Sequence, residues 1–216
     1  MTTLTTVNGM IIKRSPVGDY DFVVTILTSE RGKITAFAKG SRRPGSHLAG
    51  SVEPFCFGEF TLYEGRSSYN IQQANISNYF EYFRQDFTCS LYGMFFLELA
   101  DYYTRENNDE REVLKLLYQS LRALESDKLD NRLVKCVYEI KSLVINGEFP
   151  GIPTDRDYDG STAYTLEFIR TAPITKLFTF AVKREVLLEL EHICDIYRKR
   201  FIDRKLNSLE MLSTII

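Results

Sequence analysis

The hydrophobic pattern of this chain changes its period once, near residue 80. Before that point, branched and aromatic residues alternate with polar ones in short runs, each bounded by a turn signal such as Ser15-Pro16-Val17-Gly18-Asp19. After it, large apolar residues recur every four positions, first at Phe83, Phe87, Leu91, Phe95, Leu99 and Tyr103. A period of two is typical of a half-buried strand, and a period near 3.6 is typical of an amphipathic helix. The pattern therefore predicts an α+β protein, in which an all-β domain is followed by an all-α domain.

Five strands are expected in the first part, over residues 7–14, 22–28, 33–39, 52–63 and 69–74. Tight turns join most of them, and a long polar loop follows the third strand. Several short strands with no helix between most of them favour a sheet that closes on itself. Residues 1–80 are accordingly predicted to form a small five-stranded barrel.

Residues 81–216 are predicted to form a helical domain. Asp109 and Asp130 can cap helices over 110–124 and 131–146, and Gly147 ends the second of these. The stretch 147–164 is rich in Gly, Pro and Asp and is predicted to be a loop. Short helical pieces around Pro173, a long helix from about residue 184 to 204 and a short tail complete the chain.

The composition is that of an ordinary globular protein, with 26% charged residues and a formal net charge of −2. Because the chain is slightly acidic, a nucleic-acid partner would have to meet a local basic patch. Four cysteines without paired spacing indicate buried free thiols in a reducing cytoplasm, and neither a signal peptide nor a membrane-spanning run is visible. The two histidines lie in no nucleophile motif and no nucleotide-binding Gly-Lys loop occurs, so the chain is expected to be no enzyme and to need no cofactor.

The third predicted strand carries the most informative surface. With a period of two, one of its faces presents Lys33, Thr35, Phe37 and Lys39, while Ile34, Ala36 and Ala38 face the barrel interior. An aromatic ring between two cations can stack on a base while the lysines neutralise phosphates. The following loop adds two adjacent arginines, Arg42 and Arg43, and the first strand ends in Lys13-Arg14, which could join the same face. The alternative is that the ring packs under a loop and the cations are merely solvated.

Several blocks in this first third resemble the opening of the RecO family of bacterial recombination mediators, in the family's order and spacing. The blocks are Gly9-Met10-Ile11-Ile12-Lys13-Arg14, Gly18-Asp19-Tyr20-Asp21, Val24-Thr25-Ile26-Leu27-Thr28, Gly32-Lys33-Ile34, Ala38-Lys39-Gly40-Ser41-Arg42-Arg43, Ser46-His47-Leu48-Ala49-Gly50 and Glu53-Pro54-Phe55. The helical part resembles the family more diffusely, at Tyr92 to Leu99, Gly147-Glu148-Phe149-Pro150 and Lys205-Leu206-Asn207-Ser208-Leu209.

The resemblance implies an OB-fold barrel followed by a helical domain, in a cytoplasmic, nucleoid-associated bacterial protein. It implies partners as well: single-stranded DNA, RecR, the tail of the single-strand-binding protein and, indirectly, RecA. The family's basic barrel surface corresponds here to Lys13, Arg14, Lys39, Arg42 and Arg43. Lys33 and Arg66 are added to this DNA-binding set from the strand geometry alone, and Phe37 is added as the stacking ring.

The chain departs from the family in one respect. Many members carry a four-cysteine zinc module after the Gly-x-x-Pro segment, and this chain has no cysteine there, so no metal is expected. The run Asp155-Arg156-Asp157-Tyr158-Asp159-Gly160 matches only the first half of a calcium loop, because Leu166 stands at the twelfth position. These aspartates are expected to be solvated or to cap a helix.

The last long helix offers a partner-binding surface that would suit the acidic, hydrophobic tail of the single-strand-binding protein. Its basic residues are Arg198, Lys199, Arg200, Arg204 and Lys205, next to an apolar side. The alternative is an ordinary amphipathic helix with a solvated charged face. Two functions thus remain open: a mediator that binds and anneals single-stranded DNA and assists RecA loading with RecR, or a protein-interaction adaptor of the same family with weak or no DNA binding.

Overall fold

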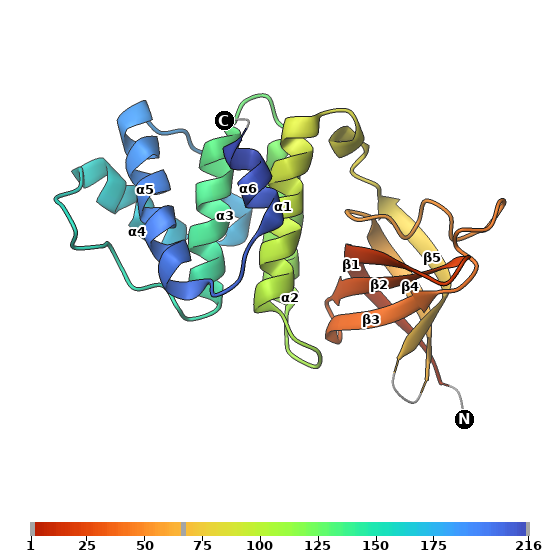
Figure 1. The fold of residues 1–216 in the computed structure, drawn as a ribbon. Coiled ribbons are helices and arrows are strands. Elements are labelled where there is room, and N and C mark those ends of the chain that lie inside the picture. The colour runs from red at the N-terminus through yellow and green to blue at the C-terminus, as the bar shows by residue number, and fades with distance from the viewer. Residues whose placement is uncertain (1–2, 66–67, 215–216) are drawn as a thin grey trace. The chain divides into compact units, whose positions relative to one another are not determined.

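The computed structural model describes residues 3–65 and 68–214 (Figure 1). Two compact units are present: one comprises the residues up to 81 together with 97–114, and the other comprises 82–96 together with 115–216. The strands belong to the first unit, and most of the helical residues belong to the second. The predicted order, an all-β part followed by a helical part, is confirmed.

The five strands form a closed barrel in the order β1-β2-β3-β5-β4. Their bounds are β1 Thr3–Val17, β2 Asp21–Thr28, β3 Gly32–Ala38, β4 Phe57–Glu64 and β5 Tyr69–Asn78. Neighbouring strands are antiparallel except β3 and β5, which pair in parallel at Ala36↔Tyr69 and Phe37↔Asn70. The predicted five-stranded, OB-like barrel is therefore confirmed.

The fourth strand begins five residues later than the alternation predicts. Residues 52–56 form turns instead, in which Phe55 has a positive φ of 74° and the Cys56 N–H donates to the Glu53 carbonyl at 3.2 Å. Pro54 has no N–H to offer a sheet ladder, which is one reason why an apolar run at this point does not extend the strand.

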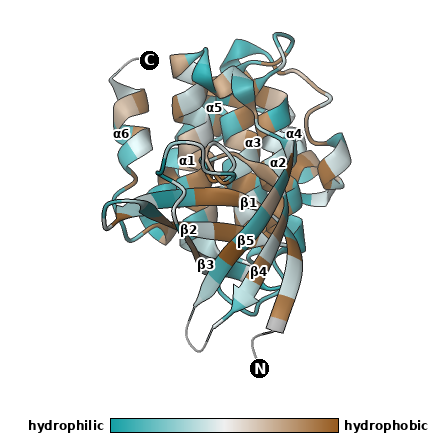
Figure 2. Cartoon of the chain, turned by 90° about the vertical axis from the view of Figure 1, so that its right-hand side faces the viewer, coloured by the Kyte–Doolittle hydropathy of each residue, from teal (hydrophilic) through white to brown (hydrophobic). Residues whose placement is uncertain are grey.

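The barrel core follows the predicted alternation of β3. Ile34, Ala36 and Ala38 are 0–1% exposed, and they share one core with residues of β1, β2, β4 and β5. The loop after β3 contributes Leu48, Val52 and Cys56 to the same core, so this loop closes one end of the barrel. In Figure 2 brown hydrophobic segments alternate with paler and teal segments along the strands.

Gly32 marks the tight start of β3. Its φ of +65° is in the left-handed region, and a Cβ there would lie 2.4 Å from the Arg105 carbonyl oxygen. The neighbouring Lys33 N–H donates to that same carbonyl at 3.0 Å. Only glycine allows the residues around 105 to approach the β2–β3 turn this closely.

Six α-helices and two short 3₁₀ helices lie in the described part of the chain. The α-helices are α1 Phe87–Tyr103, α2 Arg111–Leu124, α3 Asn131–Ile145, α4 Gly160–Thr171, α5 Arg184–Phe201 and α6 Asn207–Ser213; the 3₁₀ helices are Glu81–Arg84 and Ile174–Lys176. Asp130 caps α3 as predicted, because its carboxylate accepts from the Arg132 N–H at 2.8 Å. None of the helices among these residues is both long and apolar enough to cross a membrane.

Two helical predictions are wrong in detail. The predicted loop over 147–164 ends early, because Asp159 accepts from the Ser161 N–H at 2.7 Å and starts α4 at Gly160. Phe87, predicted on the apolar stripe of the first helix, is the first residue of α1 and is 63% exposed. All four cysteines are buried free thiols, as predicted.

Candidate nucleic-acid interface

The outer face of β3 bears the side chains that its alternation predicts. Thr35 is exposed, and Lys33 and Phe37 are half-buried; Lys39, also exposed, is the first residue after the strand. Val23 of β2 lies opposite Phe37 on one side, and Asn70 of β5 lies opposite it on the other. The Phe37 ring is therefore placed between two flanking strands, with part of its surface open to solvent.

Lys33 is less available than its position on the strand indicates. Its ammonium donates to the Asp101 carbonyl oxygen at 2.6 Å and pairs with the Asp101 carboxylate at 3.0 Å. The Lys33 and Asp101 side chains are 21% and 19% exposed, so the pair is partly desolvated. The charge of Lys33 is satisfied within the first unit, and a DNA phosphate would have to compete with a fixed carboxylate.

A second group of cations converges at the end of the barrel where β1 stops and β2 begins. The Arg14 guanidinium lies 4.1 Å from the centre of the Phe22 ring, and the Arg42 guanidinium lies 5.6 Å from it. The Arg43 guanidinium lies 4.9 Å from the centre of the Tyr20 ring. We refer to Arg14, Tyr20, Phe22, Arg42 and Arg43 as the arginine cluster.

The loop after β3 places Arg42 and Arg43 through backbone contacts. The Gly40 N–H donates to the Asp21 carboxylate at 2.7 Å, and Gly40 has a positive φ of 66°. The Arg42 N–H then donates to the Tyr20 carbonyl at 2.9 Å, and its guanidinium donates to the Gly18 carbonyl at 3.1 Å. The β1–β2 turn and the long loop thus hold one another, which places their cations together.

The predicted neighbours Lys13 and Arg14 do not share a face. Lys13 pairs across the ladder with Thr25, which lies on the outer side of β2, whereas Arg14 pairs with the buried Val24. A bulge between Ile11 and Lys13 precedes this point. Lys13 is exposed beside the outer face of β3, and Arg14 instead lies over the Phe22 ring in the arginine cluster.

The two aromatic members of the arginine cluster, Tyr20 and Phe22, are absent from the sequence-derived set. Tyr20 is 50% exposed, and Phe22 is half-buried against the barrel core. Their signal in the sequence is the alternation Tyr20-Asp21-Phe22 directly after a Gly-Asp turn, which sets two rings beside a loop rich in arginine. Arg66, another predicted site residue, lies outside the described residues.

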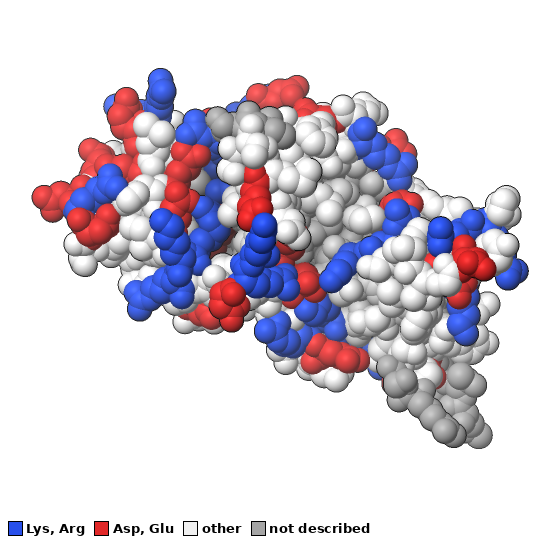
Figure 3. All heavy atoms as spheres, in the orientation of Figure 1, with Lys and Arg blue, Asp and Glu red and all other residues white. Residues whose placement is uncertain are grey.

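The electrostatic surroundings of the arginine cluster are mixed. Where the loop after β3 projects from the barrel, Figure 3 shows Lys and Arg side chains with Asp and Glu side chains among them. One contact is direct, since the Arg14 guanidinium forms an ion pair with the Glu53 carboxylate. Arg42 and Arg43 are exposed. A phosphate from solvent can approach these two arginines without displacing a buried group.

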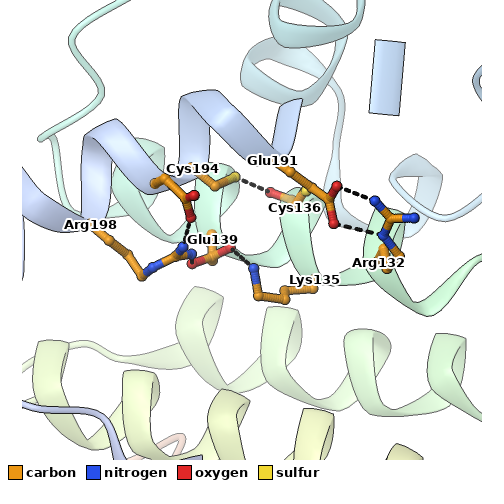
Figure 4. Close-up of polar contacts among 8 residues, drawn as sticks. Arg132, Lys135, Cys136, Glu139, Glu191, Cys194 and Arg198 are labelled. Atoms are coloured by element: carbon orange, nitrogen blue, oxygen red, sulfur yellow. Dashed lines mark hydrogen bonds and ion pairs between the residues drawn. The ribbon is translucent and has the colours of Figure 1, made fainter. Parts of the chain in front are cut away.

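The predicted partner-binding residues divide into two kinds, and two of them, Arg204 and Lys205, lie beyond α5, which ends at Phe201 and not near residue 204 as predicted. Arg198 is an internal residue: its side chain is 17% exposed and pairs with Glu139 of α3 and with Asp195 (Figure 4). Burial raises the pKa of the Glu139 carboxyl, but Lys135 and Arg198 outweigh it and the net pKa is lowered. Arg198 therefore binds α5 to α3 and offers no free charge to a partner.

The other predicted residues, Lys199, Arg200, Arg204 and Lys205, are exposed. Arg200 lines a cavity of about 430 Å³ with Ile152, Pro153, Ile196 and other residues of the loop and α5. Ile152 is 41% exposed, so this cavity has an open apolar wall. Lys205 pairs with Glu210 at 2.7 Å.

Two aspartates of the half calcium loop, Asp155 and the α4 cap Asp159, are engaged by protein groups. Asp155 accepts from the Tyr158 hydroxyl at 2.6 Å and lies 2.9 Å from Nε2 of His192. These hydrogen bonds hold the pKa of the Asp155 carboxyl well below its ordinary value. Among the described residues, no group of three or more His, Cys, Asp or Glu could hold a metal ion.

Two family models match this chain. The one described as Recombination protein O N terminal matches residues 1–80, and the one described as Recombination protein O C terminal matches residues 84–151. The DNA repair protein RecO of Acetivibrio thermocellus is 26% identical over 96% of each chain. The DNA repair protein RecO of Alkaliphilus metalliredigens is 30% identical over 66% of this chain and 58% of that protein, and that of Clostridium kluyveri is 24% identical over 96% and 93%.

Proposed function

Since the chain belongs to the RecO family of DNA repair proteins, we propose that its barrel binds single-stranded DNA and that the protein assists RecA loading together with RecR. The observation that carries the proposal is the arginine cluster, in which three guanidinium groups lie over two aromatic rings at one end of the barrel. Arginine pairs bidentately with phosphate, and a ring beside it can take the face of a base.

The outer face of β3 extends this surface. Phe37 offers a third ring, Lys13 and Lys39 offer exposed cations, and the long loop brings Arg42 and Arg43 to the barrel end. Annealing then needs no covalent chemistry, because two strands whose phosphates are neutralised and whose bases are held open can pair. Lys33 contributes least to this surface, since Asp101 already holds its ammonium.

The salt dependence of binding tests the proposal. Fluorescence anisotropy with a labelled poly-dT oligonucleotide measures the association constant across a series of salt concentrations. Each phosphate contact on a single strand contributes roughly −0.7 to the slope of log K against log salt. Arg42→Ala with Arg43→Ala should therefore flatten the slope by about 1.4 and weaken binding. The matched control replaces Lys183 and Arg184, an adjacent exposed pair at the start of α5, and should leave the slope unchanged.

The alternative function is an adaptor that has lost most of its DNA affinity. It is favoured by the acid partners of Arg14 and Lys33, which are Glu53 and Asp101. Undetectable binding of the oligonucleotide at low salt by the wild-type protein, with RecR binding intact, would establish the adaptor and refute the proposal.

For the tail of the single-strand-binding protein, the cavity beside Arg200 is the proposed docking site. An acidic, hydrophobic tail would set its apolar side chain against Ile152 and Ile196 and a carboxylate near Arg200. Lys199, the exposed residue before Arg200, is the next cation along α5. Replacing Lys199 and Arg200 by alanine should weaken binding of a labelled tail peptide several-fold. The same peptide should bind equally to wild type and to the Lys183/Arg184 control, and an equal loss in that control would refute the placement.

A further inference from the structure

One carboxylate, that of Glu53, lies inside the arginine cluster. It forms an ion pair with the guanidinium of Arg14, which also lies 4.1 Å from the centre of the Phe22 ring. The cation that lies nearest to the Phe22 ring is thus already neutralised by a group of the same protein.

Glu53 is held in this position by the backbone on both sides. Val52 is 1% exposed and belongs to the barrel core. On the other side, the Phe55 N–H donates to the Ile11 carbonyl at 3.0 Å, and the Ile11 N–H donates to the Cys56 carbonyl at 2.9 Å. The carboxylate is therefore presented to Arg14 by a backbone segment that is bound to β1.

The ion pair is nevertheless open to exchange. The side chains of Arg14 and Glu53 are 26% and 33% exposed, so water and ions reach them. An ion pair of this exposure adds little to folding stability. Its effect falls instead on any anion that approaches Arg14, because that anion must displace a carboxylate that the bound backbone keeps beside Arg14.

We propose that Glu53 is an intramolecular competitor of the DNA phosphate, and that it lowers the affinity of the barrel for single-stranded DNA. The inference rests on the proposed function. A phosphate that enters the cluster takes the place of the carboxylate on Arg14, and Glu53 returns when the strand leaves. The device keeps binding reversible, as is useful in a protein that must release a strand after it has been paired.

Glu53→Gln tests the inference, since glutamine keeps the size of the side chain and can still accept from Arg14. The association constant for the labelled poly-dT oligonucleotide should rise roughly three- to tenfold at low salt, and the slope of log K against log salt should steepen by about 0.7, the contribution of one added phosphate contact. In the double variant Arg14→Gln/Glu53→Gln both gains should disappear.

Glu59→Gln is the matched control. Glu59 is an exposed carboxylate on β4 of the same barrel, so this variant removes the same charge at a distance from Arg14. Thermal melting compares the folded state of each variant with wild type. A gain in Glu53→Gln no larger than that in Glu59→Gln, or a gain that survives in the double variant, overturns the role of Glu53 while leaving the proposed function intact. Absence of binding by both wild type and Glu53→Gln overturns the two together.

Discussion

The substitution Glu139→Gln should destabilise the helical unit far more than an exposed charge change would. Glu139 is 5% exposed and accepts from Lys135 at 3.0 Å and from Arg198. Removing one partner of a buried ion pair generally costs about 3–5 kcal/mol, because the remaining charge stays buried and unpaired. Here Arg198 retains Asp195 and only Lys135, 13% exposed, loses its partner. The expected loss is therefore at the lower end, about 3 kcal/mol.

Urea unfolding followed by far-ultraviolet circular dichroism measures the free energy of unfolding. The control is Glu167→Gln, which breaks an exposed pair with Arg170 and should leave the unfolding midpoint unchanged within error. A loss below about 1 kcal/mol in Glu139→Gln at an unchanged m-value would refute the reasoning, because it would mean that the pair is screened by water.

The same residue predicts a dependence on pH. The pKa of the Glu139 carboxyl is lowered in the folded protein, so its contribution to stability is present above its ordinary value near 4.5 and is lost as the pH falls through the lower folded value. The stability difference between wild type and Glu139→Gln should therefore be constant at neutral pH and shrink in acid below about pH 4.5. A difference that grows in acid would contradict the assignment of the charge.

Two further predictions concern the barrel. Tyr20→Ala should weaken binding of single-stranded DNA roughly fivefold or more, measured by anisotropy, because a stacked base is worth about 1–3 kcal/mol. The melting temperature should stay unchanged, because the ring is 50% exposed. An unaltered affinity would remove Tyr20 from the interface. Gly32→Ala should lower the free energy of unfolding by about 2 kcal/mol or more, because alanine would hold a left-handed conformation and meet the Arg105 carbonyl. If urea unfolding gives this variant the same stability as wild type, the turn can relax and the reasoning is refuted.

The pattern of apolar and polar residues along the chain was sufficient to predict the architecture. The alternation in β3 predicts which residues line the barrel, and Ile34, Ala36 and Ala38 are indeed buried. A period of two assigns faces independently of which strands are neighbours, so the sequence alone can separate inside from outside. Asp130 likewise caps α3 through contacts within one turn, and such contacts are readable from neighbouring residues.

Which basic side chains are free to bind a partner, by contrast, was decided by the tertiary structure. The sequence predicts that Lys33 and Arg198 are free cations. In the structure each pairs with a carboxylate far away in the chain, Lys33 with Asp101 and Arg198 with Glu139. The sequence places a charge on a face but does not say which distant carboxylate reaches that face. The pairing of an ion depends on atoms brought together only by folding.

The same reason explains the arginine cluster. Adjacent residues in a strand point to opposite sides, so Lys13 and Arg14 separate although the sequence sets them side by side. Conversely, Arg14 and Arg42 are far apart in sequence and meet over the ring of Phe22, because the loop after β3 is bound to the β1–β2 turn. The sequence by itself determined a β-barrel that carries basic residues, and the closure of that barrel decided which of them act together.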